Sequence, residues 1–398
     1  MAQSECHSRN NNWNNCVFCM NIPFNKPYLT GKEAHYMYQA VAEGKLSGNG
    51  AFTKKCQRFF EERYGFKKCL LTTSCTDALE MAAILCDIQL GDEVIVPSYT
   101  FVSSALAFVR AGAKIVFADS MMSNPNIDAE QIEALITPRT KVIVPVHYAG
   151  VACDMDRIME IANKYNLIVV EDAAQAIDSY YKGRPLGAIG HLSAFSFHET
   201  KNIISGEGGM LCINNERFIR RAEIIWEKGT NRAEFFRGEV NKYGWVDTGS
   251  SFLPSEVIAA FLWAQLENLD AIQSRRKHLW DLYHTHLSPI ANRQSPKLAM
   301  PTIPEYATNN AHMFYLVCNN LEERTALIKH LKDNGILAVF HYLSLHSSPY
   351  YTNKHDGREL RECDRYADCL VRLPMYYDLK DEEVIEVCKL INNYASDN

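Results

Sequence analysis

The chain lacks the features that mark several large classes of protein. It contains no stretch of about 18 apolar residues, so we expect no membrane-spanning helix and no membrane partner. Its first residues do not combine a basic segment with an apolar core, which argues against a secretory signal. Basic residues are not in excess, since 41 Lys and Arg stand against 47 Asp and Glu and leave a net charge of -6. We therefore expect no nucleic acid partner.

Two further observations limit the classes of protein to which the chain can belong. No G-x-G-x-x-G segment follows the first predicted strand, where TTSCTDAL stands instead, and this argues against a dinucleotide-binding oxidoreductase. Cysteine is frequent, but the 13 residues form an odd number and are scattered, with Cys86 and Cys388 in apolar stretches. This pattern favours reduced, buried thiols of a cytoplasmic protein over a disulfide framework.

Residues 1–19 differ in composition from the rest of the chain. They are rich in Asn, Ser and Cys and show no periodicity, so we predict a disordered N-terminal extension. Cys16 and Cys19 form a C-x-x-C pair with His7 nearby, which leaves a metal site as the alternative. A single pair is weak support for a metal, and we expect none.

Short apolar segments alternate with amphipathic ones in the first half of the chain. They predict strands at 68–73, 93–97, 114–118, 141–146 and 167–171, and helices at 76–86, 102–111, 129–135 and 155–165. Such alternation is typical of an α/β fold with a mostly parallel central sheet that is covered on both faces.

The pattern changes after about residue 190. Strands are expected at 194–198 and 210–213, a helix at 216–228, and a long helical region at 255–287 with a break near Leu269. A Pro- and Asn-rich connector at 288–310 precedes strands at 313–318 and 336–340, a helix at 322–334 and a last helix from Asp381. We therefore predict a large domain at 20–260 and a smaller C-terminal α+β domain at 261–398.

Polar residues follow three of the predicted strands, at the edge where open α/β sheets bind ligands. Ser74 and its neighbours begin a helix, where they could hold a phosphate or simply cap the helix. Asp172 ends a strand and could be a metal ligand, a structural acid or the partner of a cationic ring nitrogen. Lys201 precedes a Gly-rich turn; it is either a surface charge or a reactive amine.

Together the three segments match the needs of pyridoxal 5′-phosphate (PLP). This cofactor requires a lysine for a Schiff base, an acid beside its pyridine nitrogen and a cup for its phosphate. Lys201 would supply the amine, and Asp172 the acid. Thr76, Ser196 and backbone N–H groups would hold the phosphate, and Phe101 could stack on the ring.

The chain resembles the DegT/DnrJ/EryC1/StrS sugar aminotransferase family over about residues 21–395. The matching segments include IPFNKPYLTGKE, TTSCTDALEMAA, GDEVIVPSYTFVSSALAFVRAGAKIVFAD, VVEDAAQA, FSFHETKNIISGEGG and AVFHYLSLHSSPYY. The resemblance implies the fold type I architecture of PLP-dependent aminotransferases. It also implies a homodimer with its active sites at the interface.

The resemblance also implies a role for each matching residue. Lys201 would bind the cofactor and carry protons, Asp172 would pair with the pyridine nitrogen, and Gln175 would contact the ring. Tyr148 and His346 would lie near the sugar. The other implied cofactor contacts are Ser74, Cys75, Thr76 and Ser196 around the phosphate, Phe101 on the ring, and Asn231 reaching the partner's cofactor.

Segments such as HETKN, KGTNR and FFRG resemble a branch that transfers the amino group of L-glutamate to carbon 4 of dTDP-4-keto-6-deoxyglucose. The product would be a dTDP-4-amino-4,6-dideoxyhexose for a surface polysaccharide such as a lipopolysaccharide O antigen. A PLP-dependent sugar dehydratase, an aminotransferase acting at carbon 3 and a non-enzymatic ligand sensor remain as alternatives. Lys201 argues against the dehydratase, because the best-known ones carry His in its place.

Overall fold

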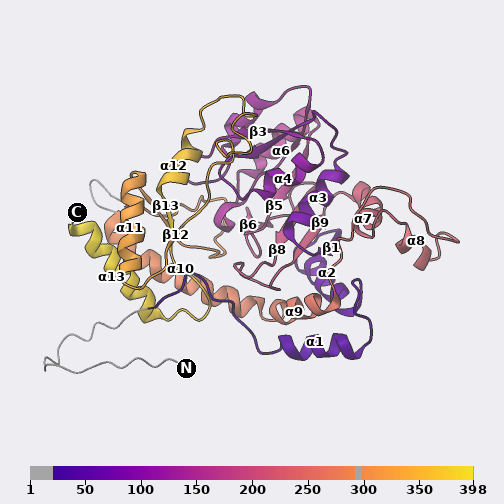
Figure 1. Cartoon of the computed structure of the whole chain (residues 1–398), viewed down its shortest axis with the longest axis horizontal. Helices are drawn as coiled ribbons and strands as arrows, with labels where there is room; N and C mark the ends of the chain where they lie inside the picture. The colour runs from indigo at the N-terminus through magenta and orange to yellow at the C-terminus, as the bar shows by residue number, and fades with distance from the viewer. Residues whose placement is uncertain (1–20, 292–297, 398) are drawn as a thin grey trace.

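The computed structural model describes residues 21–291 and 298–397 (Figure 1). The predicted N-terminal extension, with Cys16 and Cys19, lies outside these residues. Within them, no helix has the length and apolar character needed to cross a membrane, and no group of three or more potential metal ligands is found. The described cysteines are free thiols, and all but Cys75 are buried, as predicted.

The central sheet has seven strands in the order β1-β9-β8-β5-β4-β2-β3. Their bounds are β1 (Lys68–Thr72), β2 (Glu93–Pro97), β3 (Lys114–Ala118), β4 (Thr140–Ile143), β5 (Ile168–Asp172), β8 (Leu192–Ser196) and β9 (Gly209–Ile213). Only β9 runs antiparallel to its neighbours, so the mostly parallel sheet is confirmed. The carboxyl ends of β1, β5 and β8 consequently lie at one edge of the sheet.

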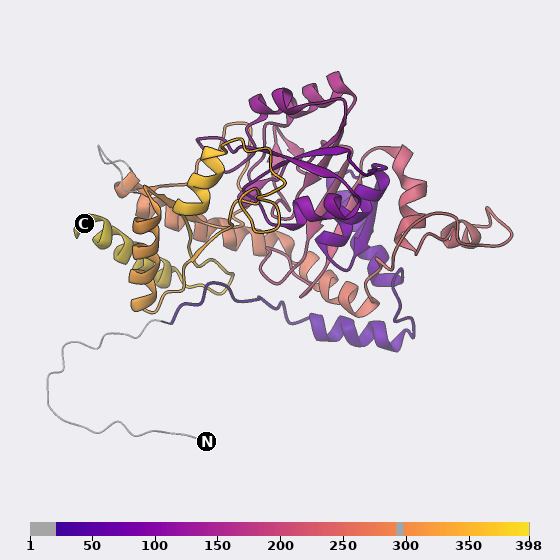
Figure 2. The same cartoon turned by 45° about the horizontal axis from the view of Figure 1, so that its top comes forward.

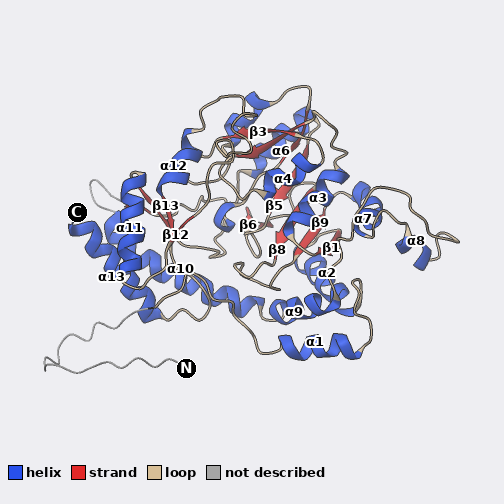
Figure 3. Ribbon diagram, viewed as in Figure 1, coloured by secondary structure: helices blue, strands red, loops and turns tan. Residues whose placement is uncertain are grey.

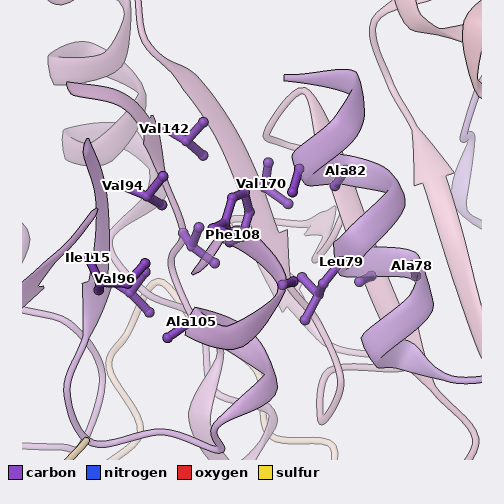
Figure 4. Close-up of a cluster of buried hydrophobic side chains, with 14 of the residues drawn as sticks. Ala78, Leu79, Ala82, Val94, Val96, Ala105, Phe108, Ile115, Val142 and Val170 are labelled. Carbon is purple, nitrogen blue, oxygen red and sulfur yellow. The ribbon is translucent and has the colours of Figure 1, made fainter. Parts of the chain in front are cut away.

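Alternate residues of these strands enter two separate hydrophobic cores. In β2, Val94 and Val96 belong to one core, whereas Ile95 belongs to the other. Figure 4 shows the first core, in which Phe108 lies among valines of neighbouring strands. Side chains of successive strand residues point to opposite faces, so strands that are apolar throughout must be covered on both sides.

Helices supply this cover, as Figure 3 shows. The first core includes residues of α3 (Cys75–Leu85), α4 (Ser103–Arg110), α7 (Ile219–Trp226) and α12 (Arg361–Cys369). The second includes residues of α2 (Ala51–Tyr64), α5 (Ala129–Ile132), α6 (Met155–Tyr165) and α9 (Glu256–Leu266), and α1 (Glu33–Ala42) packs on α9. The short elements are β6 (Tyr180–Tyr181), β7 (Arg184–Pro185), α8 (Arg232–Phe236) and the 3-10 turns Glu133–Leu135, Tyr148–Gly150 and Glu216–Phe218.

A second, antiparallel sheet has the strand order β10-β11-β13-β12. Its strands are β10 (Leu298–Ala299), β11 (Tyr315–Cys318), β12 (Val339–Phe340) and β13 (Leu370–Arg372). A third core joins it to α10 (Leu269–Ala291), α11 (Leu321–Asp333) and α13 (Asp381–Asp397). Ile22 also lies in this core and forms a bridge with Ile336. The division into domains near residue 260, which falls within α9, stays a prediction.

Several predicted strands, such as the one at 313–318, are shorter in the structure, and two of the differences have a physical reason. The strand predicted at 141–146 ends at Ile143, and Pro145 follows it. Proline has no N–H to donate to a neighbouring strand, which explains the early end. The strand predicted at 336–340 contains only Val339 and Phe340, because Ile336 pairs with the N-terminal segment instead. The predicted break near Leu269 is confirmed by the gap between α9 and α10.

The buried carboxylate of Glu171, near the carboxyl end of β5, fixes the loop that follows β7. Glu171 accepts hydrogen bonds from the backbone N–H groups of Gly187 (2.7 Å), Ile189 (2.8 Å) and Gly190, and it pairs with His147 Nε2 at 2.9 Å. Burial alone would raise the pKa of Glu171, but these hydrogen bonds lower it. The carboxylate therefore holds a loop and a histidine next to the strand end that carries Asp172.

Replacing this carboxylate should destabilise the protein strongly. We expect Glu171→Ala to lower the free energy of unfolding by about 3 to 5 kcal/mol, measured by urea denaturation, because it leaves buried donors unpaired. The exposed Glu160→Ala serves as control and should change it by less than about 0.5 kcal/mol. Because the folded pKa is lowered, this contribution is present above the unfolded pKa and is lost as the pH falls through the folded pKa. Equal effects of the two variants would contradict this role.

Candidate active site

A cavity of about 740 Å³ lies at the carboxyl ends of β1, β5 and β8, and residues of β12 and β13 line it from the second sheet. Eight of the eleven predicted site residues line this one cavity: Ser74, Cys75, Thr76, Phe101, Asp172, Gln175, Ser196 and Lys201. They come from four separate stretches of the chain, which only the sheet brings together. The ends of the strands therefore gather these residues around one space, and their roles in the site stay predictions.

One end of the cavity is suited to an anion. Ser74 caps α3, since its Oγ accepts from the backbone N–H of Asp77 at 3.0 Å. Within the described residues, the N–H groups of Cys75 and Thr76 take no partner, and they lie at the positive end of the helix dipole. The side chain of Thr76 is hydrogen-bonded to Ser103 at 2.8 Å. Capping and anion binding are therefore compatible here, because they use different groups.

Gly209 allows β9 to approach this helix end closely. It pairs with Ser196 of β8 in the sheet. A Cβ atom at this position would lie 2.4 Å from the nitrogen of Cys75 and from the carbonyl carbon of Ser74. Any larger residue would push the start of α3 away from Ser196, the other candidate for holding a phosphate.

Asp172 is buried and held by two hydrogen bonds. Its Oδ2 accepts from Ser104 Oγ at 2.6 Å, and its Oδ1 accepts from the N–H of Ala174 at 3.1 Å. Both donors fix the carboxylate at the end of β5, with one side in the cavity wall. This arrangement suits two of the roles expected for Asp172 equally, a structural acid and the partner of a cationic ring nitrogen. The described residues offer no further metal ligands beside it.

Lys201 presents its amine to the same cavity. A turn after β8 carries it, and its backbone N–H donates to His198 at 2.9 Å. No hydrogen-bond or ion-pair partner for its side chain is found in the described part of the chain. Burial, reinforced by the charge of Arg372, lowers its pKa to about 8, although Cys75 and Asp172 oppose the shift. Lys201 therefore lines the cavity instead of lying free on the surface, and its role as a reactive amine stays a prediction.

Gln175 and Phe101 also line the cavity. Gln175 Oε1 accepts from the N–H of Ala149 at 2.6 Å, and its Nε2 donates to the hydroxyl of Tyr342 at 3.1 Å. Phe101 is 55% exposed, and its ring centroid lies 6.0 Å from that of Tyr342. The amide is thus fixed in orientation, whereas the phenyl ring has an open face.

These groups fit PLP. An amine without a partner, a carboxylate held in position and unpaired N–H groups at a helix start are the three features that the cofactor needs, and they share one cavity. The volume of the cavity leaves room for a substrate beside the cofactor.

Three predicted residues lie elsewhere. Tyr148 is buried behind the cavity, and its hydroxyl is 2.9 Å from Nδ1 of His341. His346 is hydrogen-bonded to Ser98, with its Nδ1 2.8 Å from the serine Oγ, and does not line the cavity. Asn231 precedes α8, on a loop that projects from the molecule in Figure 2. Their assigned contacts to the sugar and to a partner's cofactor stay predictions.

The sequence did not point to several residues of the site. Ser104, which holds Asp172, lies within the predicted helix 102–111 and has no distinguishing neighbour there. His341 and Arg372 line the cavity from the second sheet. Arg372 ends an apolar strand, as Asp172 does, and that position was the one signal that could have identified it.

Comparison with known proteins agrees with this geometry. The sequence model of the DegT/DnrJ/EryC1/StrS aminotransferase family matches residues 27–392. The GDP-perosamine synthase of Escherichia coli O157:H7 is 32% identical over 377 residues, which cover 94% of this chain and 99% of that protein. Among solved structures, the PMP form of the putative sugar aminotransferase Spr1654 from Streptococcus pneumoniae superimposes with a TM-score of 0.86 at 26% identity, over 95% of this chain and 100% of that one. DesV of S. venezuelae, in complex with a ketimine intermediate, superimposes with a TM-score of 0.86 at 28% identity, over 94% of this chain and 99% of that one.

The lowered pKa of Lys201 predicts how cofactor attachment depends on pH. Only the neutral amine attacks an aldehyde, so the rate of covalent attachment of PLP to the cofactor-free protein should rise about tenfold per pH unit below 8 and level off above it. Visible absorbance follows the attachment, and borohydride followed by peptide mapping locates it. Lys201→Ala should take up no covalent cofactor, whereas the exposed Lys164→Ala should behave as the parent. A rate that keeps rising to pH 10 would contradict the lowered pKa.

Proposed function

Because the chain belongs to the DegT/DnrJ/EryC1/StrS aminotransferase family, we propose that it transfers the amino group of L-glutamate to carbon 4 of dTDP-4-keto-6-deoxyglucose. The chain is a PLP-dependent nucleotide-sugar aminotransferase. The observation that carries the proposal is the cavity in which the unpaired amine of Lys201 and the fixed carboxylate of Asp172 lie together.

The cavity residues would divide the work of binding the cofactor. When bound, PLP supplies an electron sink for the carbon that loses a proton. Asp172, held by Ser104, would balance the positive charge of the ring nitrogen. Ser196 and the N–H groups at the start of α3 would hold the phosphate, and Phe101 would cover one face of the ring.

Lys201 would carry the proton in both halves of the reaction. With a pKa of about 8, a useful fraction of its amine is neutral near pH 7 and can accept a proton from the α carbon of glutamate. Glutamate leaves as 2-oxoglutarate, having given up its amino group and an electron pair. The keto sugar then gains that amino group, the electron pair and a proton at carbon 4, and its carbonyl oxygen leaves as water, which balances the water that supplies the keto oxygen of 2-oxoglutarate.

The identity of the nucleotide has two candidates. The sequence motifs favour a dTDP sugar, whereas the relative named GDP-perosamine synthase favours a GDP-linked sugar. Lys201 favours amino transfer over the dehydratase alternative, and the amine, the fixed carboxylate and the helix-start N–H groups that share the cavity support an enzyme over a ligand sensor. We also propose a cytoplasmic enzyme whose amino sugar enters a surface polysaccharide such as an O antigen.

Product analysis tests this proposal directly. Enzyme, PLP and glutamate are incubated with dTDP-4-keto-6-deoxyglucose or, in parallel, with a GDP-linked 4-keto-6-deoxy sugar, and the product is assigned by NMR. We expect a 4-amino sugar from the dTDP substrate, and a loss of at least about 10³-fold in turnover for Lys201→Ala, because no other amine can replace it. An amine at carbon 3, loss of a hydroxyl without amination, or turnover by the variant would each contradict the proposal.

We further propose a homodimer, supported by the loop that carries α8. This loop exposes large apolar side chains, with Trp245 85% exposed, Phe236 70% exposed and Val246 55% exposed. An exposed apolar patch of this kind usually marks a protein interface. Asn231 lies in the same loop, where its Oδ1 accepts from the N–H of Gly244 at 2.9 Å. Docking of the loop on a second copy would bring Asn231 toward that copy's cofactor.

A charge in this loop should weaken the dimer. We expect the parent protein to sediment as a dimer, and Phe236→Glu to lower the association constant by about 100-fold, because the new carboxylate would be buried against apolar surface. Leu321→Glu is the matched control: it adds the same charge at an exposed leucine of α11, far from α8 in Figure 1. A monomeric parent, or equal behaviour of the two variants, would refute the proposed interface.

A further inference from the structure

The cavity contains a second cation besides Lys201. Arg372 ends β13 and lines the cavity, yet it is only 7% exposed. Its guanidinium stacks over the ring of Phe24 at 4.8 Å, and Nη1 lies 3.4 Å from Nε2 of His341. Among the described residues no carboxylate lies within ion-pair distance of Arg372.

Another buried arginine shows what a satisfied guanidinium looks like in this protein. Arg276 is also buried, but its Nε donates to the carbonyl of Ala311 at 3.0 Å and its Nη2 to that of His312 at 2.7 Å. Arg372 has no such carbonyl partner in the described part of the chain. A buried charge without partners is costly, so most of its five N–H donors are left for a ligand.

The hydrogen bond between Arg372 and His341 does not neutralise the guanidinium. A guanidinium can only donate, so Nε2 of His341 accepts, and the ring proton is on Nδ1, which donates to Tyr148. Burial and the charges of Arg372 and Lys201 lower the pKa of His341, so this imidazole is neutral. Tyr148 and His341 therefore orient the guanidinium and leave its charge uncompensated.

We propose that Arg372 binds a carboxylate of the amino donor in the first half of the reaction. This rests on the aminotransferase function proposed above. Asp172 would pair with the ring nitrogen of the cofactor, and the aldehyde would take up the amine of Lys201, so Arg372 would be the cation left without a counter-ion among the described residues that line the cavity. Its planar fork suits the two oxygens of a carboxylate.

The diphosphate of the nucleotide sugar offers similar anionic oxygens, but the position of Arg372 favours the amino acid. The guanidinium is nearly enclosed and its charge acts on Lys201, so it lies near the reacting carbon. A carboxylate attached to that carbon reaches this depth, whereas the diphosphate is separated from carbon 4 by the whole sugar ring.

Separate measurement of the two half-reactions tests the assignment. Glutamate is mixed with the PLP-loaded enzyme, and the keto sugar with enzyme loaded with pyridoxamine phosphate, and each single turnover is followed by the cofactor absorbance. We expect Arg372→Met to raise the glutamate concentration for half-maximal rate by about 100-fold and to change the sugar half-reaction by less than about threefold. Arg372→Lys should recover part of the loss, because it keeps the charge without the fork.

Arg361→Met, at an arginine whose side chain is 83% exposed on α12, controls for the loss of a positive charge as such and should change neither half-reaction. A loss confined to the sugar half-reaction would assign Arg372 to the diphosphate and overturn the proposal. Two unchanged half-reactions would overturn it as well.

A binding measurement remains decisive even if the proposed amino transfer fails. Calorimetry follows 2-oxoglutarate added to the PLP-loaded protein, where no amino transfer can occur because neither the ligand nor the cofactor carries an amino group to give. We expect binding by the parent and by Arg361→Met, at least about tenfold weaker binding by Arg372→Met, and unchanged binding of thymidine diphosphate. Absence of 2-oxoglutarate binding in the parent, or its full retention in Arg372→Met, would refute the carboxylate site. Failure of glutamate to react despite such binding would refute only the transfer.

Discussion

Burial of an amine without a counter-ion is the constraint on which the site depends. An ammonium group withdrawn from water loses hydration, and here no acid within bonding distance in the described chain compensates Lys201. The nearby guanidinium of Arg372 adds repulsion, and the pKa falls to about 8. Such a position is unfavourable for folding and is tolerated only because rigid elements surround it. In return, an amine with this pKa is partly neutral near pH 7, as a nucleophile or a proton carrier must be.

The sheet provides the rigidity. Three parallel strands end at one edge and place Ser74, Asp172 and Lys201, which lie at or shortly after the strand ends, around one cavity. Glu171 and Asp172 illustrate the division of labour at such an edge. The first points into the protein and fixes a loop with its hydrogen bonds, whereas the second lines the cavity. Neighbouring carboxylates on one strand therefore serve structure and chemistry separately, because alternate residues face opposite sides.

The sequence could predict only those features of the site that depend on residues close together in the chain. Continuous apolar runs indicated the strands, and polar residues directly after them indicated the cavity. Contacts between distant segments left no such pattern. His341 and Arg372 come from the second sheet, and Ser104 lies inside an ordinary helix, so their approach to Asp172 and Lys201 depends on tertiary packing. Tyr148 illustrates the same limit: its hydroxyl contacts His341 rather than the cavity, which no spacing in the sequence indicates.

The positions of Lys201 and Arg372 couple donor binding to proton transfer. The positive charge of Arg372 contributes to the lowered pKa of Lys201. A carboxylate bound to Arg372 would cancel much of that charge, and removing a like charge raises the pKa of an amine. Lys201 would then be a weaker base in the empty cavity, where it must be neutral to bind the cofactor, and a stronger base once the donor is present, when it must take a proton. Arg372 would thus keep Lys201 a weak base while the cofactor binds. Its neutralisation by the donor would make Lys201 a stronger base for the proton transfer.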